Sequence, residues 1–155
     1  MCFCNMRRWP CRTLPEAAPF PSIESTSPYP RVTQPACIFC TPDREILAES
    51  PHTLAFADAF PVSLGHTLVV PRRHVVSVFD LSEAEYSDCF LLALKVKELL
   101  VTRHAPDGFN IGANCGAAGG QSVWHAHIHV IPRFAGDTPH PRGGVRNVIP
   151  RLRDY

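Results

Sequence analysis

The sequence has no long apolar run, little charge and no basic surplus. Of its 155 residues, 19% are charged, and the formal net charge is +1. A general nucleic-acid-binding protein usually carries a clear excess of lysine and arginine, so the near-zero charge argues against that class. No apolar stretch approaches the roughly 18 residues needed to cross a bilayer. We therefore expect a protein that binds neither nucleic acid nor a membrane.

A secretory signal is also missing. Arg7 and Arg8 would suit the start of one, but no apolar segment follows them. The seven cysteines are an odd number, which without such a signal argues against a disulfide framework. The sequence therefore predicts a reducing, cytoplasmic setting. Its 45% of hydrophobic residues are enough to form one core.

Proline is unevenly spread along the chain. Seven of the 16 prolines fall in residues 1–36, where serine and threonine are also dense. Because proline fixes φ and removes a backbone donor, this density breaks helices and sheets. We expect residues 1–36 to be a disordered extension and residues 37–155 to form one domain. Two explanations of the extension stay open: an organelle transit peptide, or a start codon assigned too far upstream.

The rest of the chain predicts several short strands and one long helix. Short apolar runs bounded by proline, glycine or polar residues predict strands at 54–57, 65–70, 109–114 and 125–131. Ser82 and Glu85 have the spacing of a capping box, so a helix is expected from Glu83 to about Arg103, with Cys89 buried. Its solvated stripe is expected to comprise Asp88, Lys95, Glu98 and Thr102. The absence of strand–helix alternation favours an α+β fold with an antiparallel sheet.

Three of the eight histidines lie within five residues, at His125, His127 and His129. On a strand, residues two apart share a face, so the three imidazoles are expected side by side. Such a row makes a poor core, because burying several groups that can become charged is costly. From the residues alone, two interpretations remain: a polar strand face or surface metal site, and a catalytic or metal-binding strand.

The glycine-rich loop just before the histidines favours the second interpretation. Gly119 and Gly120 allow backbone N–H groups to face an anion, and Gln121 and Ser122 add neutral hydrogen-bond donors. A phosphate group held there would lie beside the histidines, where a neutral imidazole could attack it.

The segment from Gly120 to Arg133 reads GQSVWHAHIHVIPR and resembles the signature of the histidine-triad (HIT) family of nucleotide hydrolases and transferases. The resemblance extends over residues 37–151, through CIFC at 37–40, LAFAD at 54–58 and GHTLVVPRRH at 65–74. Residues 136–137 and 141–146 resemble the tail of bacterial members similar to dinucleoside polyphosphate hydrolases. The resemblance implies an antiparallel sheet of about five strands, with one long helix and one short helix.

The resemblance also implies roles for individual residues. His127 corresponds to the nucleophile that attacks the α-phosphorus of a nucleotide, and His129 would help manage the proton and charge at the phosphate. The implied phosphate contacts are Asn114, Gln121 and Ser122. The implied nucleoside pocket comprises Ile38, Phe39, Phe56 and Asp58, with Asp58 accepting hydrogen bonds from the ribose. The two phenylalanines could pack in the core instead of, or in addition to, binding the nucleoside. Asp58 could simply be a turn residue after a strand.

Cys37 and Cys40 have the C-x2-C spacing of half a tetrahedral zinc site. The resemblance supplies His74 and His125 as the other two ligands, which would make a closed, structural site. The alternative is a pair of cysteines in an apolar turn.

The sequence leaves open whether the substrate phosphates carry Mg²⁺. The other histidines need no metal to explain them: His52, His66, His104 and His140.

Hydrolysis is favoured by His129, because transferases and phosphorylases of the family carry glutamine at that position. Two substrate classes remain: dinucleoside polyphosphates such as diadenosine tetraphosphate, favoured by the 141–146 block, and phosphoramidates such as adenylated lysine, favoured by Asn114. The competing classes are a nucleotide-binding scaffold with incidental catalysis and a metal-handling protein. Family members generally form two-fold dimers, which would place the helix from Glu83 and the strand from Phe109 at the interface.

Overall fold

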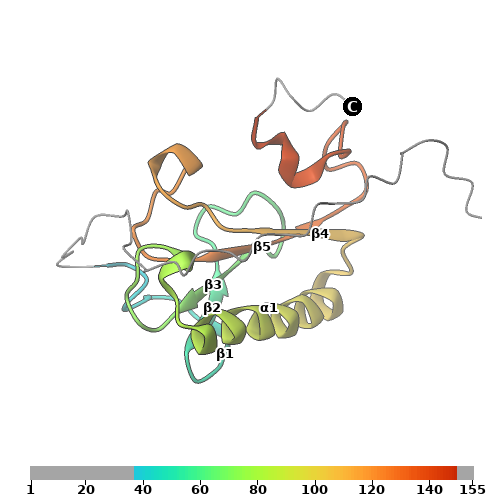
Figure 1. Cartoon of the computed structure of the whole chain (residues 1–155). Helices are drawn as coiled ribbons and strands as arrows, with labels where there is room; N and C mark the ends of the chain where they lie inside the picture. Colours follow the sequence, from blue (N-terminus) through green and yellow to red (C-terminus); the bar gives the residue numbers. More distant parts are fainter. Residues whose placement is uncertain (1–36, 150–155) are drawn as a thin grey trace, which may run out of the picture.

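The computed structural model describes residues 37–149, so the expected extension at 1–36 lies outside the described residues. Five antiparallel strands form one sheet in the order β1-β2-β3-β5-β4, crossed by the single α-helix α1 of the described part (Figure 1). The strands are β1 (Ile46–Glu49), β2 (Thr53–Ala57), β3 (Thr67–Pro71), β4 (Gly108–Gly112) and β5 (Ile128–Arg133). This confirms the expected α+β fold, with β1 as a strand that the sequence did not reveal.

Side chains alternate between the two faces of the sheet and so divide the core into two parts. On β2 and β3, Ala55 and Val69 pack toward α1, whereas Phe56, Leu68 and Val70 pack on the opposite face. This period of two is what a strand buried on both faces requires. The opposite face also holds Cys37 and Phe39, so the first described residues pack against the sheet near the end of β3.

Helix α1 (Glu83–His104) begins at the expected capping box. The Ser82 hydroxyl accepts a hydrogen bond from the Glu85 N–H, and the Glu85 carboxylate accepts one from the Ser82 N–H. Its buried side is apolar apart from Glu85 and is formed by Glu85, Cys89, Leu92, Ala93, Val96 and Leu100. The helix ends at Ala105, whose left-handed conformation closes the last turn. The burial of Cys89 is confirmed.

The expected solvated stripe of α1 is correct for three of its four residues. Lys95, Glu98 and Thr102 are exposed, but Asp88 is half-buried. The Asp88 carboxylate accepts hydrogen bonds from the Ser50 hydroxyl, the Thr53 hydroxyl and the His52 N–H, at 2.6 to 2.9 Å. Asp88 therefore attaches the helix to the β1–β2 turn instead of facing water.

A second polar contact holds α1 to the chain that follows β3. The Arg73 guanidinium donates two hydrogen bonds of 2.7 Å to the Glu85 carboxylate, in a fork-like pair. This pairing and the Ser82 contacts lower the pKa of Glu85 to about 2. The segment between β3 and α1 is thereby fixed in place.

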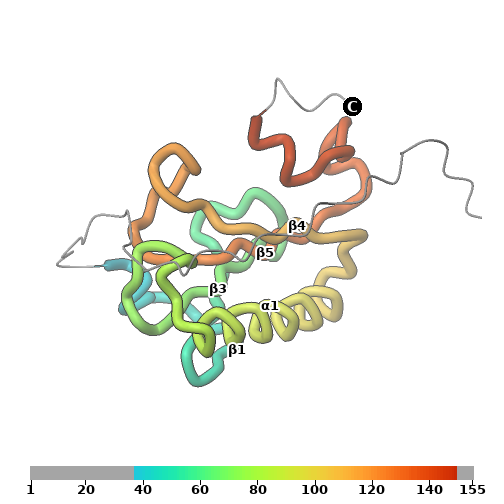
Figure 2. Tube along the Cα trace, viewed as in Figure 1, coloured from blue at the N-terminus to red at the C-terminus, as the bar shows by residue number. Residues whose placement is uncertain are grey.

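Three short 3-10 helices complete the described part: η1 (Val78–Asp80), η2 (Ala117–Gly119) and η3 (Gly144–Val148). In the view of Figure 2, η3 lies above β4 and α1 lies below the sheet. Within residues 37–149, no helix combines the length and apolarity needed to cross a membrane.

Candidate functional site

The three neighbouring histidines do not all lie on one strand. The sequence predicted a strand over 125–131, but β5 begins at Ile128 and runs through Pro132 to Arg133. Of the three, only His129 belongs to it, paired with Leu68 of β3 and Gly112 of β4. The strand starts late because the preceding residues pair elsewhere: the Ala126 N–H donates to the Val75 carbonyl oxygen, 2.6 Å away.

His127 is buried, and its ring is held from two sides. Nδ1 donates a hydrogen bond of 2.7 Å to the backbone carbonyl oxygen of His125. The ring packs edge-on against Phe39, with 5.2 Å between centroids, and against His129, with 4.9 Å. In the neutral imidazole this hydrogen bond places the proton on Nδ1, so the lone pair lies on Nε2. A nucleophile of this kind needs no prior deprotonation.

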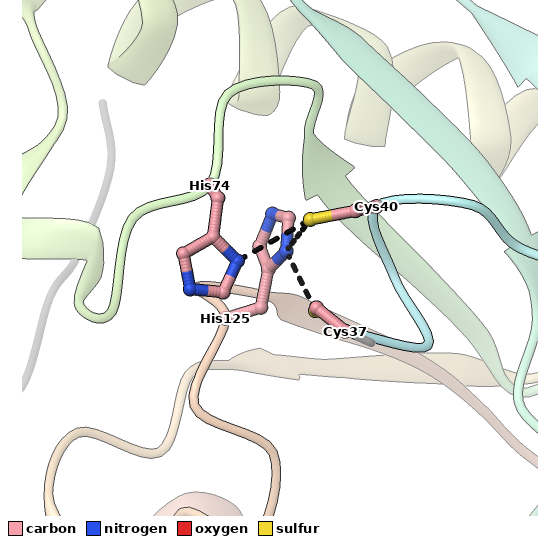
Figure 3. Close-up of side chains that lie close together, drawn as sticks. All are labelled: Cys37, Cys40, His74 and His125. Carbon is pink, nitrogen blue, oxygen red and sulfur yellow. Dashed lines mark hydrogen bonds between the residues drawn. The ribbon is translucent and has the colours of Figure 1, made fainter. Parts of the chain in front are cut away.

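The ring of His125 belongs to a different group, formed with Cys37, Cys40 and His74. The ligand atoms of these four residues all lie within 4.8 Å of one another. Figure 3 shows the four side chains converging from the 37–40 turn, the segment after β3 and the segment before β5. The turn is closed by a 3.0 Å hydrogen bond from the Cys40 N–H to the Cys37 carbonyl oxygen, so both sulfurs face the histidines.

The hydrogen bonds of His125 define which nitrogen faces the sulfurs. Nε2 donates to the carbonyl oxygen of Pro71 at 2.9 Å, which leaves the lone pair of Nδ1 directed at Cys37 Sγ, 3.3 Å away. This is the arrangement of a histidine ligand with a backbone partner on its other nitrogen. Burial, the main cause, lowers the pKa of His125 to about 4, so the ring is neutral. Burial and the neighbouring Cys37 raise the pKa of the Cys40 thiol.

A second cluster joins His129 to two residues of the β2–β3 connection. Nε2 of His66 lies 3.0 Å from Nδ1 of His129, and an oxygen of Asp58 lies 3.4 Å from Nδ1 of His66. Burial lowers the pKa of both histidines, to about 4 for His129. Nε2 of His129 is buried and has no hydrogen-bond partner among the described residues.

Sequence reasoning missed His66 as part of this site. The residue lies just before β3 and is 3% exposed, close to the third triad histidine. The pairing of Thr67 with Val130 and of Leu68 with His129 brings it there, although 63 residues separate it from His129. A polar residue directly before an all-buried strand was the only signal in the sequence.

The glycine-rich loop is held mainly by Gln121. Its amide nitrogen donates to the carbonyl oxygens of Val76 and Val123, and its amide oxygen accepts from the Gly116 N–H. Both amide hydrogens are therefore used by the backbone, and Gln121 is 6% exposed. Ser122 and Asn114 are exposed. Gly116 and Gly120 have φ values of +72° and +83°, which favour glycine.

The four expected nucleoside residues lie in different surroundings. Ile38 is 55% exposed, whereas Phe39 is 5% exposed and Phe56 is completely buried. Phe39 packs between Phe56 and His127, and the Arg44 guanidinium lies over the Phe56 ring. In this conformation Phe56 lies beneath Phe39 and is part of the core. The Asp58 carboxylate accepts the Phe60 N–H and faces His66.

Comparison with known proteins gives consistent matches. The profile of the HIT domain matches residues 41–136. The AP-4-A phosphorylase of Mycobacterium tuberculosis is 33% identical over 112 residues, which are 70% of this chain and 57% of that enzyme.

Solved structures agree with this match. A HIT family protein from Bacillus anthracis is 35% identical, with a TM-score of 0.64 over 68% of this chain and 78% of that chain. A zinc-bound histidine triad family protein from Mycobacterium smegmatis is 32% identical, with a TM-score of 0.60 over 66% of this chain and 78% of that one.

Proposed function

The chain belongs to the HIT domain family, and we propose that it hydrolyses nucleotides at the α-phosphate, with His127 as the nucleophile. The observation that supports this most is the hydrogen bond from Nδ1 of His127 to the His125 carbonyl oxygen. In the neutral ring it leaves the lone pair on Nε2, and His129, whose own pKa is lowered, packs beside this ring. These are the roles that the resemblance assigns to the two residues.

The proposed reaction has two steps. Nε2 of His127 forms a bond to the α-phosphorus while the bond from that phosphorus to the leaving group breaks, and the leaving group takes the electron pair. A water molecule then attacks the same phosphorus, the phosphorus–nitrogen bond breaks, and the lone pair returns to Nε2. The proton lost by the water passes to a base or to solvent. The products are a nucleoside monophosphate and the free leaving group.

Donors for the phosphate oxygens are proposed to come from the loop. Ser122 and Asn114 are exposed and can donate directly. Gln121 holds the loop backbone through its own amide, so in the observed conformation its contribution is to position the loop. The unpartnered Nε2 of His129 is a further group that a phosphate oxygen or the leaving group would satisfy.

The nucleoside is proposed to bind next to Phe39. Ile38 provides exposed apolar surface, and Phe39, backed by Phe56, provides the ring that contacts His127. Asp58 is proposed to accept the ribose hydroxyls with a carboxylate that is 16% exposed. That role is compatible with its contact to His66, because one carboxylate can accept several hydrogen bonds.

A structural zinc ion is proposed for Cys37, Cys40, His74 and His125. Two sulfurs and two imidazoles are a donor set that zinc prefers, and the His125 lone pair already faces the sulfurs. When bound, zinc would hold the thiolates and join the 37–40 turn to the segment that carries His127. With four protein ligands the site would be closed, as structural zinc sites are.

Dinucleoside polyphosphates are our first proposed substrate class, supported by the 141–146 block and by a relative named AP-4-A phosphorylase. Phosphoramidates such as adenylated lysine are the second, favoured by Asn114. A scaffold that binds nucleotides with incidental catalysis is a candidate from another class.

A homodimer is also proposed, on the basis of an apolar surface shared by α1 and the edge strand β4. Phe90 and Leu94 of α1 are 43% and 54% exposed, and Ile111 of β4 is 44% exposed. A second copy would cover these side chains and pair the free edge of β4. A cytoplasmic setting remains a proposal, supported by the free thiols of the described cysteines.

The test is turnover of diadenosine tetraphosphate and of adenylated lysine by the full chain, compared with His127→Ala. We expect the wild type to release adenosine monophosphate and the variant to be inactive on both. Activity that survives His127→Ala would overturn the proposed mechanism. If neither compound is turned over and adenosine monophosphate still binds, the scaffold would be favoured.

A further inference from the structure

Cys37 and Cys40 form a pair of thiols within the Cys/His cluster. Both sulfurs face the same nitrogen, since Nδ1 of His125 lies 3.3 Å from Cys37 Sγ and 3.6 Å from Cys40 Sγ (Figure 3). The two sulfurs lie within 4.8 Å of each other. Two thiols this close can bind a metal, as proposed above, and they can also be oxidised to a disulfide.

The backbone between the two cysteines is compatible with a disulfide. The Cys40 N–H donates a 3.0 Å hydrogen bond to the Cys37 carbonyl oxygen, which makes residues 37–40 a β-turn. In such a turn the first and fourth Cα atoms are less than about 7 Å apart, and disulfides join Cα atoms that are about 4.4 to 6.8 Å apart. The sulfurs can therefore meet by rotation of the side chains, without unfolding of the turn.

The two cysteines differ in their access to solvent. Cys40 is exposed, whereas Cys37 is only 7% exposed. An oxidant in solution would reach Cys40 first, and Cys37 would be the neighbouring thiol that completes the disulfide. An accessible sulfur beside a second, resolving thiol is typical of redox-sensitive cysteine pairs. The other two cysteines of the described residues, Cys89 and Cys115, lie outside the cluster.

A disulfide would disturb the surroundings of His127 by two routes. The first is His125, whose buried ring contacts the sulfurs and whose carbonyl oxygen accepts the 2.7 Å hydrogen bond from Nδ1 of His127. The second is Phe39, which lies between the two cysteines in the turn and packs edge-on against the His127 ring. Drawing the two sulfurs together would therefore shift two groups that hold this ring.

From these observations we propose that Cys37 and Cys40 are a modification site, at which a hydroperoxide such as hydrogen peroxide forms a disulfide. The disulfide releases the proposed zinc ion and lowers the rate of the reaction at His127. The oxidation itself does not depend on the proposed function, whereas its effect on turnover rests on it. The pair thereby links the redox state of the surroundings to the activity of the protein.

One peroxide molecule is consumed for each disulfide. The Cys40 sulfur attacks a peroxide oxygen, the oxygen–oxygen bond breaks, and a sulfenic acid and one water form. The Cys37 sulfur then attacks the Cys40 sulfur, the sulfur–oxygen bond breaks, and a second water leaves. The sulfurs lose two electrons, which reduce the peroxide, and the two thiol protons end in water. Because zinc is held by thiolates, the disulfide leaves only His74 and His125 as ligands.

The experiment treats the full chain with one equivalent of hydrogen peroxide, blocks the remaining thiols and digests the protein with trypsin. Residues 32–44 form one tryptic peptide that contains both cysteines. We expect this peptide to lose two hydrogens and to take up no blocking group, and a coloured chelator to detect the released zinc. Turnover of diadenosine tetraphosphate should fall at least about tenfold, as when a group that orients a reactive histidine is lost. Dithiothreitol and added zinc should restore it.

Cys115→Ser is the matched control, because it removes a partly exposed thiol outside the cluster and should respond to peroxide as the wild type does. Two free thiols in the 32–44 peptide after treatment, or a disulfide that leaves turnover unchanged, would overturn the proposal. So would a loss of turnover that Cys115→Ser abolishes.

His127→Ala separates this proposal from the proposed function. Its disulfide and its zinc release should match those of the wild type, because neither needs the nucleophile. If wild-type turnover proves independent of His127, the proposed function fails, and the state of the 32–44 peptide still tests the oxidation.

Discussion

The carbonyl oxygen of His125 accepts a 2.7 Å hydrogen bond from Nδ1 of His127, while the His125 ring lies in the cluster with Cys37, Cys40 and His74. The side chain of His125 is thus part of the proposed metal site, and its backbone carbonyl oxygen positions the proposed nucleophile, His127. The tautomer of His127 is set by that carbonyl oxygen. A stable position of His125 is therefore a condition for a correctly presented Nε2.

The zinc content of the purified protein tests whether this cluster binds a metal. We expect about one zinc per chain in the purified protein, because the two thiols and two imidazoles of the cluster lie close enough together to bind it. Replacing Cys37 and Cys40 by serine should remove the metal and lower the melting temperature by at least about 5 °C. The measurements are elemental analysis and thermal unfolding. Cys115→Ser should keep the zinc, because Cys115 lies outside the cluster. Wild-type protein without zinc would contradict the proposal.

The pKa of His129 predicts a loss of stability in acid. Burial, with help from His127 and His66, lowers it to about 4, whereas the unfolded chain has a value near 6.5. Between these values the unfolded state binds a proton that the folded state does not, so the free energy of unfolding falls as the pH drops from 6.5 toward 4.

Urea unfolding at several pH values would detect this effect. His129→Asn should reduce the acid-induced loss of unfolding free energy by on the order of 1–2 kcal/mol at pH 4.5. Above pH 6.5 it should leave the pH dependence of stability unchanged. The variant should still lose some stability as the pH falls, because His66 and His125 also have lowered pKa values. His140→Asn, at an exposed position, is the control. If the unfolding free energy of His129→Asn falls with pH as steeply as that of the wild type, the prediction is refuted.

Glu85 should stabilise the fold at neutral pH, and its contribution is also lost in acid, at a lower pH than the effect of His129. The Arg73 pair lowers its pKa to about 2 from an ordinary value of 4.5, so its contribution is complete above pH 4.5 and is lost as the pH falls toward 2. We expect Glu85→Gln to lower the free energy of unfolding at pH 7 by about 1–2 kcal/mol, reduced by solvent because Arg73 is half-exposed. Denaturant titration measures this. Glu83→Gln, exposed in the same helical turn, should change stability by less than about 0.5 kcal/mol.

The apolar surface of α1 and β4 predicts a dimer that a single charge would disrupt. Leu94→Asp should convert the protein to a monomer at micromolar concentration, because a carboxylate would be buried at the interface without a partner. Light scattering after gel filtration gives the mass. Leu64→Asp places the same charge on another exposed leucine and should leave the mass unchanged. A monomeric wild type would argue against the dimer.

Much of the fold followed from local sequence signals. The Ser82–Glu85 capping box placed the start of α1 correctly, because both partners lie within one turn. Strands β2 and β3 followed from apolar runs that are buried on both faces. Strand β1 was missed because it has only four residues, two of them half-buried and two exposed, and depends on pairing with β2.

The site was harder to predict, because tertiary pairing decides what each histidine contacts. The cluster of Cys37, Cys40, His74 and His125 was implied by resemblance, and the structure brings these residues together. The even spacing of the triad suggested one strand face, but contacts with Val75 and Pro71 hold the first residues outside β5. His66 could not be singled out, since only the β3–β5 register brings it to His129.

The central claim is that His127 becomes covalently attached to the nucleotide during turnover. The direct measurement is mass spectrometry of the full-length protein, mixed with diadenosine tetraphosphate and quenched within milliseconds in alkali, where a phosphorus–nitrogen bond survives. We predict an adenylyl group on the peptide that contains His127, absent in His127→Ala, whose kcat should fall at least about 1000-fold. Turnover at an undiminished rate in His127→Ala, or an adenylyl group attached to another residue, would contradict the account.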